Sequence, residues 1–346
     1  MMIGRIPRRL LIVGIVTAAI GCDNVSWGGM SLSLEGPPGD TLAPPTRAPG
    51  SEAAASPQRI EYGPLLYAGI RQGDSALVVP VAELVDGRLQ PLSQGDSATQ
   101  LAGQVLEERL FPGQELTLFH QGTRIGTLTV SSPLGTATDY CPPRAQVLGH
   151  LELVPSASGA QRFLALGESP GRQWPYGLFQ TMAVERTHQN AAQNLAGEAL
   201  NQLGAQWPPA LQNIRQDLQL FQLSTGEAPS IVASFLFQDQ MGVGPAPGES
   251  YSLLILGEPR GTGFDRAFTW YRRVGDEGKG APRFFSRMDW DGDGEEELLL
   301  EVFGAETQWW AALDREDGSW TMAFQDPCGA PEALGPSGEG SQGGSR

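Results

Sequence analysis

The stretch DWDGDGEEELLLEV, from Asp289 to Val302, places an acidic, glycine-containing turn directly before an apolar strand. In an extended turn, residues two positions apart point the same way, so the carboxylates of Asp289, Asp291 and Asp293 are expected to converge on one centre. Gly294 then allows the tight bend that leads the chain into the strand. Carboxylates that converge at the entrance to a strand indicate a site for a hard cation.

Two further oxygen ligands are expected from the same loop, namely the backbone carbonyl of Glu295 and the carboxylate of Glu297. An all-oxygen shell of this size suits Ca²⁺ better than the smaller, strictly octahedral Mg²⁺. An EF-hand loop would need a bidentate Glu at its twelfth position, where this chain has Leu300, and a strand rather than a helix follows. The predicted calcium ligands are therefore Asp289, Asp291, Asp293, Glu295 and Glu297.

The pattern D-x-D-G-D-G-x-x-E followed by LLLEVFG resembles the calcium loops of FG-GAP and VCBS type β-repeats of exported bacterial and cell-surface proteins. The resemblance covers only this loop, and it implies a calcium site between two β-strands. The alternative is a solvated acidic turn in a glycine-rich hairpin.

A segment with weaker similarity to the loop lies upstream, since residues 222–237 align without a gap with residues 289–304. The apolar strand positions agree, but Gln222, Ser224, Gly226 and Ser230 stand at the four side-chain ligand positions, so this copy would not bind a divalent ion. If the two segments are true repeats, the C-terminal part is a short FG-GAP/VCBS-like β-repeat array. The alternative is a chance similarity between two turn-and-strand segments.

Short apolar runs separated by Gly and Pro predict a mainly β protein. Residues 116–130 alternate around Gln121-Gly122 as a hairpin does, and residues 307–324 do so around Asp317-Gly318. Further strands are expected at 65–70, 76–81, 162–166, 252–256 and 268–272. The exception is a helix at 187–203, capped by Thr187 and ended by Gly204, which is expected to separate two β-rich regions.

The expected domain organisation follows from these segments. Pro-, Gly-, Ala-, Ser- and Thr-rich stretches contain almost nothing to bury and are expected to be disordered. The predicted parts are a lipoprotein signal peptide (1–21), a disordered tether (22–57), a β-rich domain (58–182), the helix (183–204), a β-repeat domain with the calcium loop (205–328) and a disordered tail (329–346).

The N-terminus has the features of an export signal. Three arginines precede an apolar run, Leu10 to Ile20, that is too short to span a bilayer but suits a signal-peptide core. The run ends in Ala-Ile-Gly-Cys, which resembles the lipobox of bacterial lipoproteins and implies lipidation of Cys22. The chain is then anchored to a membrane at the cell envelope, on its periplasmic or extracellular face. An ordinary secretory signal with a chance cysteine, or an uncleaved anchor, is the alternative.

Charge and cysteine content agree with export. The formal charge of −16 becomes −19 when the three signal arginines are removed, which argues against nucleic acid as a partner. With Cys22 lipidated, Cys141 and Cys328 remain as a pair in an oxidising compartment, and we predict a disulfide between them, with buried free thiols as the alternative.

An enzymatic reading depends on one motif, G-x-S-x-G at residues 167–171, with Glu185 and His188 downstream. The residue after Ser169 is Pro170, which lacks the backbone N–H that the oxyanion hole of such a motif requires. No catalytic residue is therefore predicted.

The tryptophans offer a candidate ligand surface. Trp270, Trp309, Trp310 and Trp320 lie near the calcium loop in sequence, so exposed members could contact a carbohydrate or protein ligand, with core packing as the alternative. The sequence favours a tethered, calcium-binding β module that binds a ligand or has a structural role; an exported hydrolase with unrecognised catalytic residues is the second interpretation.

Overall fold

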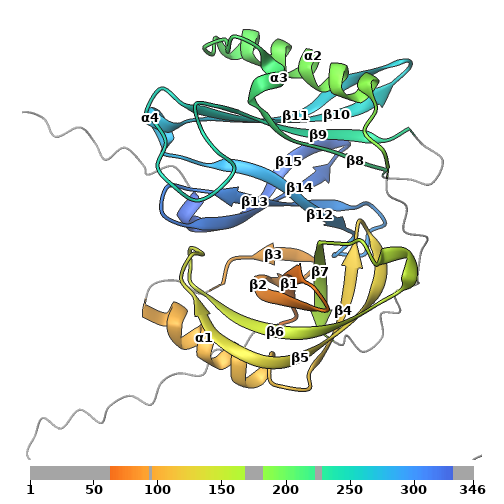
Figure 1. The fold of residues 1–346 in the computed structure, drawn as a ribbon, viewed down its shortest axis with the longest axis vertical. Coiled ribbons are helices and arrows are strands. Elements are labelled where there is room, and N and C mark those ends of the chain that lie inside the picture. Colours follow the sequence, from red (N-terminus) through yellow and green to blue (C-terminus); the bar gives the residue numbers. More distant parts are fainter. Residues whose placement is uncertain (1–62, 93–95, 168–181, 223–227, 330–346) are drawn as a thin grey trace, which may run out of the picture. The chain divides into compact units, whose positions relative to one another are not determined.

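The computed structural model describes residues 63–92, 96–167, 182–222 and 228–329 of the chain. All of them belong to one compact unit, Arg59–Arg346. The prediction of a mainly β protein is confirmed, because three antiparallel sheets make up most of this part (Figure 1). The predicted signal peptide, Cys22 and the tether lie outside the described residues, as does the tail beyond Gly329.

The first sheet closes on itself as a barrel. It contains β1 (Leu65–Gln72), β2 (Ser75–Val85), β3 (Arg88–Gln90), β4 (Glu115–His120), β5 (Thr123–Ala137), β6 (Arg144–Leu153) and β7 (Arg162–Gly167). The strand order is β1-β7-β4-β5-β6-β2-β3, and β1 also pairs with β2. This pairing closes a ring of six strands, from which β3 extends.

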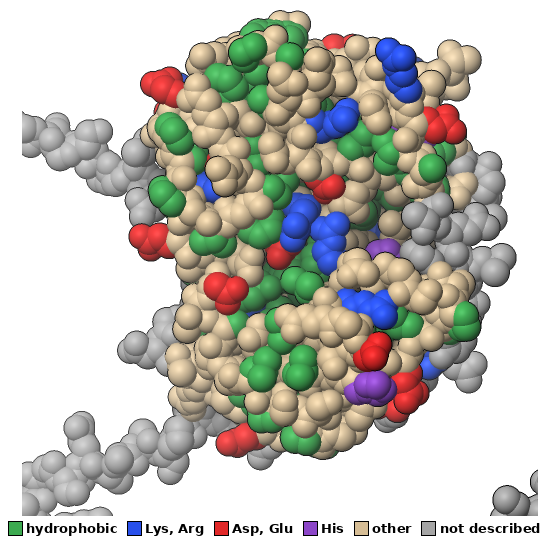
Figure 2. All heavy atoms as spheres, viewed as in Figure 1, with side chains coloured by type: hydrophobic (Ala, Val, Ile, Leu, Met, Phe, Trp, Pro, Cys, Tyr) green, Lys and Arg blue, Asp and Glu red, His purple; other side chains and the backbone are tan. Residues whose placement is uncertain are grey.

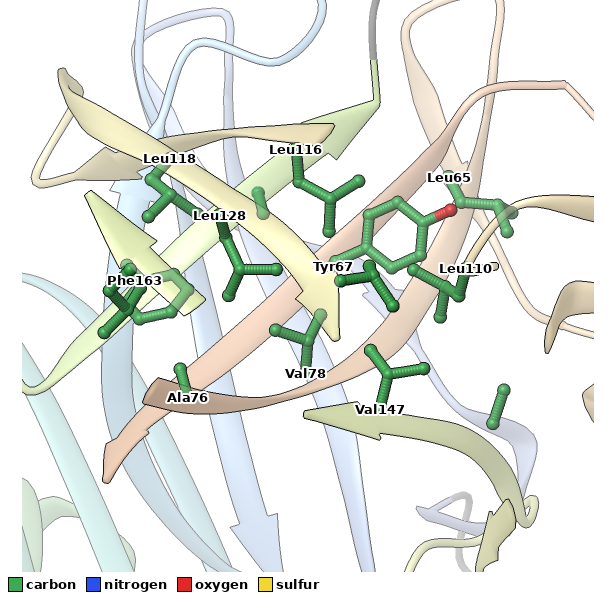
Figure 3. Close-up of a cluster of buried hydrophobic side chains, with 14 of the residues drawn as sticks. Leu65, Tyr67, Ala76, Val78, Leu110, Leu116, Leu118, Leu128, Val147 and Phe163 are labelled. Carbon is green, nitrogen blue, oxygen red and sulfur yellow. The ribbon is translucent and has the colours of Figure 1, made fainter. Parts of the chain in front are cut away.

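Alternation along each strand fills the barrel interior. Leu65 and Tyr67 point inward to join Leu116, Leu128 and other buried side chains, as Figure 3 shows. Helix α1 (Asp96–Glu108) packs on β5 and β6 and contributes apolar side chains to the same interior cluster. This helix was not predicted, because its N-terminal half is polar and only a narrow stripe of the helix is buried.

The second and third sheets are both four-stranded meanders. One contains β8 (Arg215–Phe221), β9 (Ser230–Phe237), β10 (Tyr251–Arg260) and β11 (Gly263–Arg273). The other contains β12 (Ala281–Met288), β13 (Glu297–Phe303), β14 (Gln308–Glu316) and β15 (Ser319–Gln325). The two similar segments take the same place in the order of the two sheets. Residues 222–237 follow β8 and include β9, and residues 289–304 follow β12 and include β13. The repeat itself stays a prediction, since residues 223–227 are outside the described part.

The sheet β12–β15 is covered on both faces. Leu298, Leu300 and Val302 of β13 pack against the β8–β11 sheet in one apolar cluster. Leu299 points the other way and joins Trp310 and Phe285 against the outer side of the barrel. Every residue of β13 is buried as a result. The barrel and the two meanders therefore share one continuous set of packed layers.

Helix α2 (Arg186–Leu203) lies in the chain between the barrel strands and β8, and the division into two regions at this helix stays a prediction. It packs on β9, β10 and β11 through Leu195, Leu200 and neighbouring alanines. Its predicted end at Gly204 is correct, with φ of 60°, but the predicted Thr187 cap is wrong, because the helix begins one residue earlier. The backbone N–H of Glu185 donates to Nδ1 of His188 at 3.1 Å, which caps the first turn instead.

The remaining helices are short. They are α3 (Leu211–Ile214), α4 (Val274–Glu277) and two 3₁₀ turns (Pro155–Ala157 and Pro327–Gly329). Within the described ranges, no helix combines the length and the apolar character needed to cross a membrane.

Two covalent or ionic links fasten the barrel to the chain after β15. Cys141 and Cys328 form the predicted disulfide pair, with their Cα atoms 5.9 Å apart. Arg144 and Asp326 form an ion pair in which neither side chain is exposed to solvent. The guanidinium also donates to the carbonyl of Pro80 at 2.7 Å, and Asp326 accepts the N–H of Trp310 at 2.9 Å. One buried pair thus joins β2, β6 and β14.

Candidate metal centre

The acidic loop joins β12 to β13, as the sequence predicted. Met288 ends β12 and Glu297 begins β13, and these two residues face each other across the sheet. Gly292 and Gly294 have φ of 88° and 95°, which favours glycine at both bends. The strand that follows confirms the reason for rejecting an EF-hand.

Four of the predicted ligands converge. One carboxylate oxygen from each of Asp289, Asp291, Asp293 and Glu297 lies within 4.8 Å of the others, so this cluster can hold a metal ion. Asp291 and Asp293 are exposed, whereas Glu297 is buried at the base of the loop. Glu295 is predicted to contribute its backbone carbonyl oxygen, and this role stays a prediction. Its carboxylate is not part of the cluster.

Hydrogen bonds to the carboxylates shape the turn. Asp291 Oδ1 accepts the N–H of Asp293 at 2.9 Å, and Asp293 Oδ1 accepts the N–H of Glu295 at 2.7 Å. Glu297 Oε2 accepts the N–H of Trp290 at 2.9 Å, which ties the start of the loop to the strand at its end. The side chains are thereby held in place by the backbone of the loop itself.

The electrostatics of the cluster favour a bound cation. Burial raises the pKa of Glu297 to about 9, and the negative charge of Asp291 adds to this shift, while the Trp290 N–H opposes it. Burial and the charges of Asp293 and Asp289 also raise the pKa of Asp291. Both shifts reflect negative charge confined in a partly desolvated space, which a divalent cation would relieve.

Two hairpin turns of the barrel touch this loop. At Gly87, in the β2–β3 turn, a Cβ atom would lie 2.7 Å from Cβ of Asp291. At Gly122, in the β4–β5 turn, a Cβ atom would overlap Oε1 of Glu296. The N–H of Gly122 donates to the carbonyl of Arg287 at 2.9 Å, and Arg287 is ion-paired with Glu296. The candidate metal centre therefore lies where the third sheet meets the barrel.

Sequence reasoning missed these barrel contacts. In the sequence Glu296 looks like one more solvent-facing acid of the loop, yet its side chain is only 18 % exposed and is ion-paired with Arg287. The available signal was the glycine itself in the pairs Asp86-Gly87 and Gln121-Gly122, since a hairpin glycine also allows close approach of another chain segment.

The tryptophans do not form an exposed row. Trp270, Trp309, Trp310 and Trp320 are at most 8 % exposed, and Trp290 of the loop is 6 % exposed. The alternative of core packing is confirmed for these residues. Trp310 stacks on Tyr140 with ring centroids 6.0 Å apart, which adds to the contact between the third sheet and the barrel.

The residues of the enzymatic interpretation are not brought into a site within the described part. Ser169 lies outside the described residues, and His188 serves as the α2 cap. Among the described histidines, His120 has its pKa lowered to about 4, chiefly by burial, with the positive charges of Arg162 and Arg287 adding to the shift.

Comparison with protein-family models, with curated proteins and with solved structures finds no match to this chain.

Proposed function

We propose that the loop binds Ca²⁺ and that the ion clamps the third sheet to the barrel, within an exported, lipid-anchored protein of the cell envelope. The convergence of four carboxylates at the first residue of β13 carries this proposal. A fixed ion at this point would hold together the loop, the strand and the two barrel turns that contact the loop.

The chemistry of the cluster supports calcium. All four candidate ligands are carboxylates, and hard oxygen donors select Ca²⁺ or Mg²⁺ over metals that prefer nitrogen or sulfur. The loop resembles FG-GAP and VCBS calcium loops, in which backbone oxygen completes a large shell. A shell of this size fits Ca²⁺, since Mg²⁺ retains most of its water.

The envelope location is supported by the sequence of the N-terminus and by the cysteine pair. Cys141 and Cys328 lie at disulfide distance, and disulfides persist in oxidising compartments. An extracellular or periplasmic compartment also supplies the millimolar calcium that weak extracellular sites require. We infer a structural or ligand-binding module held at the membrane through Cys22.

Calcium titration of the purified protein tests the proposal. An extracellular type of site has a dissociation constant of about 10⁻⁴ to 10⁻³ M, so calcium at ten times that value adds about 1.4 kcal/mol to the free energy of unfolding. The expected rise in melting temperature is about 3–6 °C. Trp290 should report the same event by a change in fluorescence, because its backbone N–H is bonded to a ligand.

Variants separate a specific site from general ionic effects. Asp291→Asn removes one ligand charge and should abolish the shift, whereas Glu316→Gln removes an exposed carboxylate from the end of β14 and should leave it intact. Mg²⁺ at the same concentration should raise the melting temperature by less than Ca²⁺ does. If calcium moves neither the melting curve nor the fluorescence of folded wild-type protein, the proposed function is wrong.

A further inference from the structure

A pocket lies between the barrel, the second sheet and β12, and none of the described residues that line it belongs to the acidic loop. Its volume is about 310 Å³, at the lower end of the range for small-molecule sites. Its walls come from the end of β4, the start of β7, the middle of β8 and the chain before α2. Junctions between packed layers are a common place for ligand sites because several elements supply side chains there.

One wall of the pocket is apolar. Leu218 and Leu220 of β8 line one part of the pocket together with Met182 and Val184, and Phe285 of β12 lines another part. Val184 is 38 % exposed, although it is a large apolar residue. An apolar ligand body of moderate size would remove this surface from water.

Arg162 is the one Lys or Arg among the described residues that line the pocket, and it lies beside Phe285. Its guanidinium donates to the carbonyl of Phe284 at 3.3 Å and lies 5.9 Å from the ring centroid of Phe285. These contacts fix the position of the planar group. Figure 2 shows basic and acidic side chains gathered with apolar ones at mid-height on one face of the molecule.

The neighbours of Arg162 decide which anion fits. His120 hydrogen-bonds the backbone carbonyl of Arg162, and with its lowered pKa it is neutral at pH 7. Asp217 and Glu301 act on Arg162 as nearby negative charges, although Glu301 is itself paired with Arg283. These acids repel any anion, and the repulsion grows with the charge of the ligand, so a single carboxylate on the fork of one guanidinium is favoured over a polyanion.

Amide side chains supply the remaining polar contacts. Gln219 donates through Nε2 to the carboxylate of Asp217 at 2.6 Å and to the carbonyl of Phe284 at 3.0 Å. Gln121 and Gln161 also line the pocket. These uncharged groups hydrogen-bond a ligand without adding charge.

We propose that this pocket binds a small monocarboxylate with an apolar body, its carboxylate on Arg162 and its body against Leu218, Leu220 and Phe285. This ligand site goes beyond the proposed calcium clamp and uses none of the residues of the acidic loop. Binding is therefore expected both with calcium and with a chelator present.

Matched probes test the ligand class on the full-length protein. The acids are octanoate and 4-phenylbutyrate, and the controls are the corresponding alcohols and a hexyl phosphate, with binding followed by ligand-observed NMR and equilibrium dialysis. At least one acid should bind, and its alcohol should bind about tenfold more weakly or less, since a charged hydrogen bond is lost. The phosphate should also bind more weakly than the acid.

Three variants locate the site. Arg162→Gln should weaken binding of the acid about tenfold or more. Arg260→Gln removes an exposed arginine on β10 and should leave binding unchanged. Leu218→Trp should block the pocket while keeping Arg162, and it serves as the test should Arg162→Gln fail to fold.

Several results would overturn the proposal. Equal binding of acid and alcohol would mean an apolar cavity without carboxylate selectivity. Equal loss in the Arg162 and Arg260 variants would mean general charge attraction, and unchanged binding in Leu218→Trp would place the ligand elsewhere. Absence of binding by both acids to folded protein would refute the site, whatever the outcome of the calcium titration.

Discussion

Loss of one partner from the buried pair of Arg144 and Asp326 should be among the most destabilising single changes in the described part of the chain. Neither side chain has any solvent exposure, and arginine stays protonated in proteins, so Asp326→Asn leaves a positive charge in the interior. Breaking a buried pair in this way costs about 3–5 kcal/mol of unfolding free energy. The asparagine can still accept the N–H of Trp310, so the loss measures charge rather than shape.

Removal of the other partner, Arg144, changes how the stability of the protein depends on pH. In Arg144→Met the carboxylate of Asp326 loses the positive charge that opposes the upward shift of its pKa by burial. A raised folded-state pKa favours the folded protein at low pH, because the folded state takes up the proton first. Stability of this variant should therefore rise relative to wild type as the pH is lowered toward the ordinary pKa of an aspartate.

Urea denaturation at fixed pH measures both effects, with Asp265→Asn as the control. Asp265 pairs with Arg260 on the surface, where their side chains are 54 % and 78 % exposed, and such pairs contribute about 0–1 kcal/mol. The double variant Arg144→Met/Asp326→Leu should cost less than the sum of the single changes. A loss below about 1 kcal/mol in Asp326→Asn, similar to the control, would refute the assignment of this pair as the main ionic link.

The remaining predictions concern pH, the disulfide and the membrane anchor. His120 has a folded-state pKa of about 4, below the ordinary value of 6.5, so its protonation in the unfolded chain should remove about 2 kcal/mol of stability between pH 7 and pH 5. Urea titrations of His120→Gln should show a correspondingly flatter pH dependence, and an unchanged slope would contradict the buried, neutral imidazole. Cys328→Ser opens a loop of 187 residues and should lower stability by at most about 5 kcal/mol; thiol labelling of unreduced, denatured wild-type protein should leave Cys141 unlabelled. Cys22→Ser should yield protein that no longer partitions into detergent phase, and persistent partitioning would exclude the lipid anchor.

Local signals explain what the sequence predicted correctly. The turns Gln121-Gly122 and Asp317-Gly318 both have positive φ at their two central residues, which is the backbone that such pairs favour in two-residue hairpins. The acidic loop could be predicted equally well, because its candidate ligands lie within nine residues and residue spacing alone brings them together.

Contacts between distant segments explain what was missed. The pairing of β1 with both β2 and β7 closes the barrel, yet nothing in the short alternating strands specifies which neighbours they choose. The tryptophan pair of β14 shows the same limit. Alternation predicts opposite faces for Trp309 and Trp310, but both are buried because a second layer covers each face of the sheet.

The double coverage of β12–β15 also determines how the chain can be divided. A fragment that ends after β7 would expose the barrel surface that packs on Phe285, Leu299 and Trp310. The complementary fragment would expose the same apolar side chains from its own side. Truncation at this point should give two aggregation-prone pieces, yet the same matching surfaces should let them reassemble when co-expressed. The junction is therefore a suitable place to split the protein for a fragment-complementation reporter.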